Sequence, residues 1–403
     1  MTQDNVTQDN RKKSLKDSFN KIASHPKKLI VSVIAAVALA VGGGAALNQE
    51  VENASSMPVA SAPAQIQTTA ATVQATPATV QATPAQAAPV VASIVLSPTA
   101  LPAPIAERPP QTVEVALETI ELQGKLADGT TFNYWTFNGK VPGPFVRVRE
   151  GDTVHVMMKN AEGSMVMHNV DFHAVTGPGG GAAATVAMPG ETGEFTFKAM
   201  NPGIYVYHCA TAPVAWHIAK GMYGMILVEP KVPLEPVDHE FYVMQGEIYT
   251  RQAHGTAGAL DDDYQKLIDE APEYYVFNGA SGALVTDAPL KAKVGETIRI
   301  YFGVGGPNKT SSFHVIGEIF DKAYQLGALT SEPLTNVQTI TVPPGGATVV
   351  EMKLEVPGKY MLVDHALSRA TRGLLGILEV EGAENPEVFK PAKPAQKPPS
   401  MQH

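Results

Sequence analysis

Hydrophobic and polar residues alternate in short runs through most of the chain, from residue 105 to residue 382. The run TVHVMM at residues 153–158, for example, combines β-branched and apolar residues in a short, strand-like pattern. Clusters of Gly, Pro and Asn separate such runs, and long helical periodicity is scarce, with residues 261–270 as the best candidate for a short helix. Short β-rich runs with turn residues between them are typical of an all-β sandwich, which we predict for this region.

Segments from the first half of this region recur in the same order in the second half. FNG at residues 137–139 returns at residues 277–279, and PGIY at 202–205 returns as PGKY at 357–360. Seven matches of this kind occur in one order, which indicates a duplicated domain. We therefore predict two tandem domains, residues 105–232 and residues 233–382.

An apolar run from residue 29 to residue 47 follows an amino-terminal flank that carries seven Lys and Arg residues. A basic flank before an apolar stretch is typical of an export signal or of a single membrane anchor, and the sequence leaves both open. A buried helix of a soluble protein is the third interpretation. A signal or an anchor would place the rest of the chain outside the cytoplasm, either exported to the periplasm or membrane-anchored through residues 29–47 and facing the periplasm.

The segments that flank the predicted domains have compositions that do not favour a packed hydrophobic core. Residues 48–104 are rich in Ala, Pro, Thr, Val and Gln, and they contain the segment ATVQATP twice in tandem. We predict an extended, disordered linker there, after a basic amino terminus with its signal or anchor at residues 1–47. The tail of residues 383–403 is rich in proline and lysine and has the same character. The formal net charge of −9 argues against nucleic acid as a partner.

The single cysteine of the chain lies in a sequence that favours metal binding. Cys209 is followed closely by His217 and Met222, and His168 is a candidate imidazole from upstream. A thiolate, two imidazoles and a weak axial thioether form the ligand set of a blue, or type 1, copper site. An exported protein normally pairs its cysteines, so a lone cysteine is well explained as a metal thiolate. A buried and inert cysteine is the alternative.

Two further histidines predict a second metal site. His208 directly precedes Cys209, and His173 lies five residues after His168. On a regular strand both spacings place the two side chains on opposite faces, so one member of each pair serves the blue copper and the other serves a second ion. The peptide between His208 and Cys209 would then join the two ions. His365 is the best candidate for a third ligand, and three histidines with an open position describe a catalytic copper site.

Two more side chains are candidates for proton transfer at this second site. Asp171 lies between His168 and His173, where it would be near the open position, able to hydrogen-bond a bound anion and to pass it a proton. His314 is a second possible proton donor, because histidine titrates near neutral pH. The alternatives are a turn or surface carboxylate for Asp171 and a core histidine for His314.

These motifs in combination closely resemble those of the copper-containing nitrite reductases. The resemblance covers residues 105–382 and rests on HNVDFHA, on YHCA with the His and Met that follow it, on FHVIG and on VDHAL. It implies two cupredoxin domains, each a Greek-key β-sandwich, in a homotrimer with two copper ions per subunit. It also implies reduction of nitrite to nitric oxide, with electrons from a small cupredoxin or a c-type cytochrome.

The resemblance also implies a role for each candidate residue. Type 1 copper would be bound by His168, Cys209, His217 and Met222. Type 2 copper would be bound by His173 and His208, together with His365 from a neighbouring subunit. The proton donors of the active site would be Asp171 and His314. One subunit alone would therefore hold an incomplete type 2 site.

Two other classes of copper protein share parts of this pattern. A laccase-like multicopper oxidase needs a three-copper cluster built from several His-x-His pairs, one of them His-Cys-His. In this chain Cys209 is followed by Ala210, and no His-x-His occurs anywhere. An electron carrier with one blue copper would explain Cys209 and its loop, but it would not explain the pairing of His173 and His208.

Overall fold

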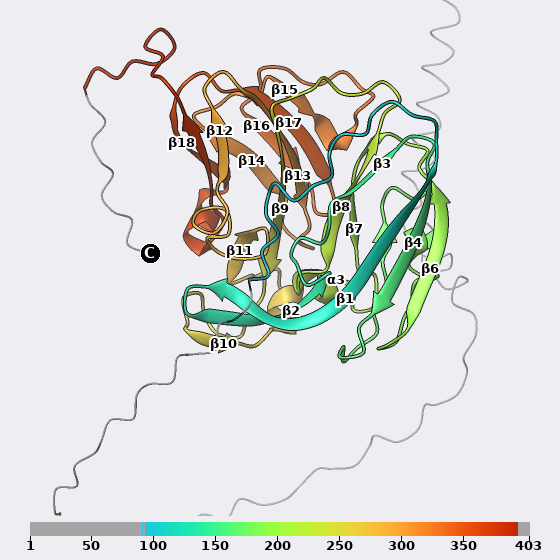
Figure 1. The fold of residues 1–403 in the computed structure, drawn as a ribbon. Coiled ribbons are helices and arrows are strands. Elements are labelled where there is room, and N and C mark those ends of the chain that lie inside the picture. Colours follow the sequence, from blue (N-terminus) through green and yellow to red (C-terminus); the bar gives the residue numbers. More distant parts are fainter. Residues whose placement is uncertain (1–90, 92, 394–403) are drawn as a thin grey trace, which may run out of the picture. The chain divides into compact units, whose positions relative to one another are not determined.

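The computed structural model describes residue 91 and residues 93–393, and Figure 1 shows their fold. The predicted signal or anchor at residues 1–47, most of the predicted linker and the last ten residues of the tail lie outside the described residues. Strands dominate the described part, and its helices are all short. None of these helices has the length and apolar character that a membrane crossing requires.

Two sheets form the first β-sandwich. The first sheet has the order β10 (Gly258–Leu260), β2 (Thr130–Phe137), β1 (Thr112–Ala127), β4 (Thr153–Asn160) and β6 (Thr192–Lys198). The second sheet has the order β3 (Val146–Arg149), β8 (Tyr223–Glu229), β7 (Gly203–His208) and β5 (Asp171–Phe172). A buried hydrophobic cluster joins side chains of both sheets, among them Val156 of β4 and Tyr207 of β7. Because strand side chains alternate between faces, each sheet places one row of residues in this core.

Two further sheets form the second β-sandwich. One has the order β11 (Tyr274–Phe277), β9 (His239–Ile248), β13 (Thr297–Val304), β17 (Ala347–Lys353) and β15 (Lys322–Tyr324). The other has the order β12 (Leu290–Lys293), β19 (Gly376–Glu381), β18 (Gly358–Asp364), β14 (Ser311–Ile316) and β16 (Thr339–Val342). Their shared core includes Ile300 of β13 and Leu362 of β18.

The two sandwiches repeat one topology, as the duplicated sequence segments predict. In the first, β1 pairs with β2 antiparallel and with β4 parallel, and β4 pairs with β6 antiparallel. In the second, β9 pairs with β11 antiparallel and with β13 parallel, and β13 pairs with β17 antiparallel. The facing sheets correspond in the same way, since β3-β8-β7-β5 matches β12-β19-β18-β14. The prediction of an all-β fold with two tandem sandwiches is therefore confirmed, while the exact boundary at residues 232 and 233 stays a prediction.

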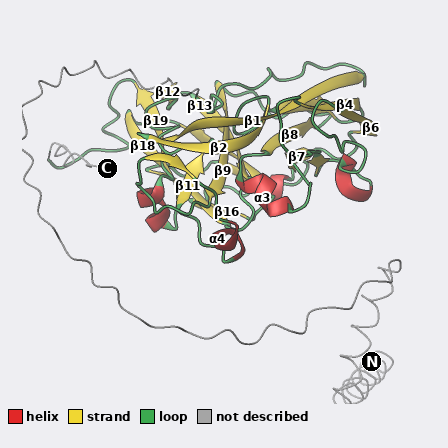
Figure 2. Ribbon diagram, turned by 90° about the horizontal axis from the view of Figure 1, so that it is seen from below, coloured by secondary structure: helices red, strands yellow, loops and turns green. Residues whose placement is uncertain are grey.

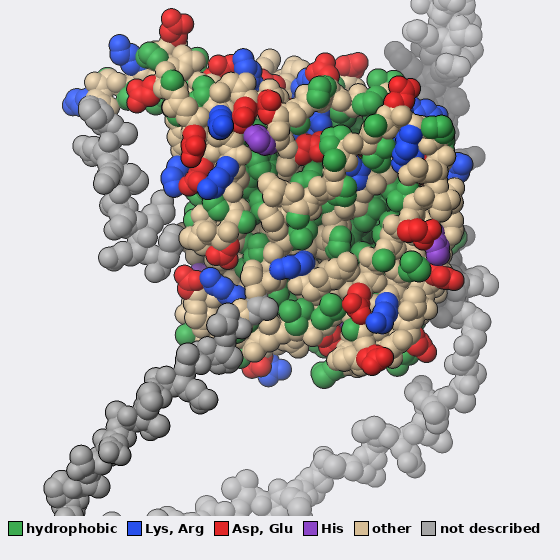
Figure 3. Space-filling view, in the orientation of Figure 1, with side chains coloured by type: hydrophobic (Ala, Val, Ile, Leu, Met, Phe, Trp, Pro, Cys, Tyr) green, Lys and Arg blue, Asp and Glu red, His purple; other side chains and the backbone are tan. Residues whose placement is uncertain are grey.

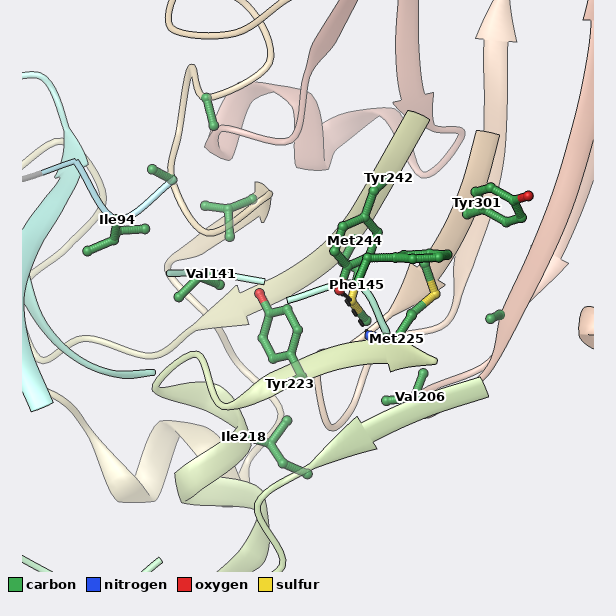
Figure 4. Packing of buried hydrophobic residues seen from close by; sticks show 14 of the residues in the cluster. Ile94, Val141, Phe145, Val206, Ile218, Tyr223, Met225, Tyr242, Met244 and Tyr301 are labelled. Atoms are coloured by element: carbon green, nitrogen blue, oxygen red, sulfur yellow. Dashed lines mark hydrogen bonds between the residues drawn. The ribbon is translucent and has the colours of Figure 1, made fainter. Parts of the chain in front are cut away.

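A third hydrophobic cluster joins the two halves of the chain. Figure 4 shows Tyr223 and Met225 of β8 packed close to Tyr242 of β9. The Met225 backbone N–H donates to the Tyr242 hydroxyl at 2.9 Å, and that hydroxyl donates to the Gly143 carbonyl oxygen at 3.2 Å. This buried contact holds the loops and strands of one sandwich against those of the other.

The last part of the predicted linker packs against both sandwiches. Ile94 is fully buried, and its carbonyl oxygen accepts a hydrogen bond from Val141 N at 2.8 Å. Further along, the Pro98 carbonyl accepts from Tyr242 N at 2.7 Å. The prediction of a disordered linker up to residue 104 is therefore wrong for residues 93–104, which pack on the folded part of the chain. The Ile94 side chain packs against Gly124. This one apolar contact anchors a segment whose composition resembles that of a linker.

Among residues 93–393, five short helices connect the strands. They are α3 (Val214–Ala219), α4 (Tyr264–Ile268) and the 3-10 helices η1 (Pro178–Gly181), η2 (Gln325–Gly327) and η3 (Leu367–Arg372). The helix α4 confirms the short helix predicted within residues 261–270, and Asp263 caps it by accepting from Lys266 N at 3.0 Å. Figure 2 shows α3 and α4 close together on one side of the molecule.

Candidate metal centres

The first candidate centre brings together side chains from a loop, a strand end and a short helix of the first sandwich. His168 lies in the loop between β4 and β5, Cys209 directly follows β7, and His217 is on α3. The Cys209 sulfur is 3.4 Å from His217 Nδ1 and 3.9 Å from His168 Nδ1, and the two nitrogens are 3.2 Å apart. Metal–nitrogen and metal–thiolate bonds of about 2.0–2.3 Å fit inside a triangle of this size. The donor set and its spacing therefore suit a copper ion.

Burial shapes the electrostatics of this first centre. All three side chains are almost fully buried, and desolvation lowers the pKa of His168 and lowers that of His217 to about 3. Both imidazoles are thus neutral at physiological pH, with lone pairs free for a metal. Burial raises the pKa of the Cys209 thiol, so the thiolate needs a cation beside it to form. A bound metal ion supplies that charge.

Two neighbours that the sequence analysis did not single out orient the first centre. The Glu121 carboxylate of β1 lies 3.2 Å from His168 Nε2, which leaves His168 Nδ1 directed at the sulfur. The Asn169 side-chain oxygen accepts from Ala210 N at 2.7 Å and lies 3.6 Å from the Cys209 sulfur. No motif reveals Glu121 because it is 47 residues from its histidine in sequence.

A backbone hydrogen bond places Met222 next to Cys209. The Cys209 N–H donates to the Met222 carbonyl oxygen at 3.1 Å, and the Met222 side chain is fully buried in the same hydrophobic cluster as Cys209. The structure thus places Met222 beside the first centre, and its role as the axial ligand stays a prediction.

The second candidate centre lies across β7 from the first. His173 Nε2 and His208 Nε2 are 3.0 Å apart, and Asp171 completes a group whose potential ligand atoms all lie within 4.8 Å of one another. The pairing of β5 with β7 sets Asp171 directly opposite His208. His208 and Cys209 belong to different clusters, and so do His168 and His173. A regular strand carries only His208 of these four, because His168 lies in a loop and His173 and Cys209 each directly follow a strand.

Hydrogen bonds fix both histidines of the second centre in one orientation. His208 Nδ1 donates to the Cys209 carbonyl oxygen at 3.0 Å, and His173 Nδ1 donates to the Gly345 carbonyl oxygen at 3.2 Å. Both Nε2 atoms are therefore left as acceptors that can bind a metal. Gly345 belongs to the turn before β17, so the second sandwich orients a histidine of the first.

The glycine-rich loop at residues 177–181 packs on the Asp171 carboxylate. Gly180 has a positive φ of 55°, and a Cβ atom at this position would collide with Asp171 Oδ1. Glycine is required both for this backbone conformation and for the close approach. No sequence motif assigns this loop to the site, and the contact shows that the loop positions Asp171.

His314 and His365 form a separate pair on the second sandwich. Their ring centroids are 5.6 Å apart, with His314 on β14 and His365 directly after β18. His314 Nδ1 donates to the Gln338 carbonyl oxygen at 2.6 Å, and the His365 side chain is exposed. Within the described residues of one chain, His365 is not grouped with His173 and His208. Within one chain, Asp171 is the third potential ligand beside these two histidines, and the role of His365 as a ligand stays a prediction.

Two cupredoxin-like sandwiches, with a buried Cys-His-His cluster beside a second histidine cluster, define a cupredoxin-type copper protein. Residues 119–233 match a family model described as multicopper oxidase. The chain is 55% identical over 303 residues to a copper-containing nitrite reductase of Neisseria meningitidis, covering 75% of this chain and 78% of that one. The chain belongs to the family of copper-containing nitrite reductases.

Solved structures agree with this assignment. A copper nitrite reductase from Nitrosomonas europaea matches with a TM-score of 0.61 at 35% identity, over 68% of this chain and 96% of that one. A copper-containing nitrite reductase from Thermus scotoductus matches with a TM-score of 0.59 at 32% identity, over 68% of this chain and 63% of that one. The laccase-like alternative finds no support in the residues, because Cys209 is followed by Ala210.

Proposed function

We propose that this chain reduces nitrite to nitric oxide at the cluster of His173 and His208. Electrons enter at the cluster of His168, Cys209 and His217. The observation that carries this proposal is the direct covalent link between the two clusters, since His208 and Cys209 are adjacent residues in different clusters. Copper bound at the two clusters supplies the one-electron chemistry. The reaction takes up one electron and two protons for each nitrite and releases nitric oxide and water.

Asp171 is the proposed first proton donor. Its carboxylate shares the cluster of His173 and His208, is half-buried, and is covered on one side by Gly180. From there it can hydrogen-bond an oxygen of nitrite and pass a proton to it as the N–O bond breaks. The close packing of the loop limits the positions that the carboxylate can adopt, which is what an oriented proton donor needs.

The second proton donor and the third ligand are proposed to come together from a neighbouring subunit of a homotrimer. His314 and His365 lie side by side in one chain, so a neighbour that brings His365 to the His173–His208 cluster brings His314 as well. Apolar side chains gather between charged ones across the middle of the face shown in Figure 3, and such surfaces are typical of contacts between subunits.

Nitric oxide release tests the reaction itself. Copper-loaded protein, given nitrite and a reduced dye without oxygen, should release nitric oxide, measured with an electrode. About two coppers per chain support the enzyme, whereas about one supports an electron carrier. Protein that carries both coppers and releases no nitric oxide would contradict nitrite as the substrate, and oxygen consumption would then be measured.

We also propose that the enzyme works facing the periplasm, with residues 29–47 cleaved after export or retained as a membrane tether. The basic flank and apolar run support this placement. Fractionation of cells that express the full chain tests it. Enzyme released by osmotic shock indicates cleavage, enzyme in the membrane fraction indicates a tether, and enzyme found only in the cytoplasm rules out both.

The proposed electron donor is a small cupredoxin or a c-type cytochrome, since each delivers one electron at a time to a one-electron site. A reduced candidate donor should be oxidised by the enzyme only when nitrite is present. Oxidation that persists in a Cys209→Ser variant would mean that the donor does not use the first centre.

A further inference from the structure

Lys220 is a lysine that the fold buries beside the first metal centre. It follows the last residue of α3, is 3% exposed, and its ammonium lies 2.9 Å from Asp262 Oδ1. The same ammonium lies 5.0 Å from the ring centroid of Phe132 and 4.9 Å from that of Trp135. A buried charge is costly unless it is paired, and aromatic faces attract a desolvated cation. These contacts therefore explain how the lysine is held, but not why it is there.

Trp135 connects Lys220 to the metal centre. Its ring centroid is 4.6 Å from that of His217 and 5.4 Å from that of His168. The backbone reinforces this contact, because Trp135 N donates to the Lys220 carbonyl oxygen at 3.0 Å. One indole thus touches the ammonium and both imidazoles of the first centre, within a buried region of low polarity.

Asp262 holds this arrangement from the second half of the chain. One carboxylate oxygen pairs with Lys220, and the other accepts from Trp216 Nε1 at 2.8 Å. Asp262 lies two residues before α4, and Figure 2 shows α4 close to α3. Its side chain is 32% exposed whereas that of Lys220 is 4% exposed, so water screens the negative charge more than the positive one.

We propose that Lys220 is a positioning residue that raises the reduction potential of copper at the first centre. The proposal rests on the proposed function, in that it takes His168, Cys209 and His217 as ligands of the type 1 copper. Oxidised copper carries one more positive charge than reduced copper, so a fixed positive charge nearby favours the reduced ion. Because the ammonium is buried, salt screens this effect much less than it would at the surface.

Two substitutions that remove charges of opposite sign test the proposal. In Lys220→Met, the equilibrium constant for electron exchange between the copper and a redox dye should shift about tenfold towards oxidised copper. A tenfold shift corresponds to a reduction potential lower by about 59 mV for one electron. In Asp262→Asn, which removes the negative charge, the constant should shift the other way. A merely loosened structure would move both variants in the same direction, and Lys220→Arg, which keeps the charge, should stay near the parent chain.

A lysine of the neighbouring helix serves as the control. Lys266 pairs with Glu273 at 2.7 Å and donates to the Thr250 carbonyl oxygen at 2.8 Å. It has no contact with Trp135 among the described interactions, so Lys266→Met should leave the potential unchanged. Metal-free protein gives a second readout, because the chain has only two tryptophans and both lie near the Lys220 ammonium. Lys220→Met should change their fluorescence, and Lys266→Met should not.

Three outcomes would overturn the proposal. One is an equal potential in the parent chain and Lys220→Met, and another is a shift in the same direction in Lys220→Met and Asp262→Asn. The third is parent protein that binds copper without blue absorption, which overturns the assigned type 1 ligands and this proposal with them. If Lys220→Met does not fold, Asp262→Asn and Lys220→Arg still decide between a charge effect and a structural one.

Discussion

Replacing Asp171 with Asn should slow nitrite reduction about 10²- to 10⁴-fold, the range that an oriented general acid contributes. The Asn side chain has the same shape and can still hydrogen-bond nitrite, but it has no acidic proton to transfer. The first centre should be untouched, because Asp171 shares its cluster with His173 and His208 and not with Cys209. Blue absorption should therefore stay at the level of the parent chain while nitric oxide release falls.

The measurement is steady-state nitric oxide release at saturating nitrite, with copper content determined for each variant. Asp128→Asn is the matched control, because the Asp128 side chain is 99% exposed on a turn and forms only a surface ion pair with Lys125. This control should keep full activity. Unchanged turnover in Asp171→Asn would remove Asp171 from the mechanism. Loss of the blue absorption would mean that the two centres are not independent.

The parts of the site that the sequence predicts are those set by local strand geometry. The order His208-Cys209 on a strand that ends at residue 208 is enough to separate the two clusters, because adjacent strand residues face opposite ways. The duplicated segments predict the repeated sheet topology for a similar reason, since each short motif carries its own strand and turn signals.

The parts that the sequence does not predict depend on contacts between distant segments. Glu121 on β1 meets His168, and the Gly345 carbonyl oxygen meets His173 across 172 residues of sequence. These pairs arise from the packing of whole sheets, so no spacing rule in one sequence reveals them. The buried Ile94 in a Pro- and Ala-rich segment is missed for a different reason, because composition describes an average and one side chain can anchor a segment.

Replacing His365 with Ala should abolish nitric oxide release and leave blue absorption intact. If His365 completes the second centre, two histidines remain there, and affinity for copper should fall by more than the 10- to 100-fold typical of losing a group that only supports a ligand. Copper content should drop towards one ion per chain. His239→Ala is the control, because His239 is the exposed first residue of β9 and pairs with Glu296 at 3.0 Å. If both copper ions stay in His365→Ala, His365 is not the third ligand.

Mixing two inactive variants tests whether His365 acts from a neighbouring subunit. We expect His173→Ala and His365→Ala chains, each inactive alone, to regain activity when they are co-expressed in equal amounts. In a closed ring with each site shared by two neighbours, half of the sites keep His173 and half of those meet a neighbour with His365. About one quarter of the sites should then be intact.

No recovery in the mixed protein would show that each site is built from one chain, because every chain then lacks one ligand. Recovery near one quarter would instead make the contact between neighbouring subunits part of the active site, consistent with the separation of His365 from His173 and His208 within one chain.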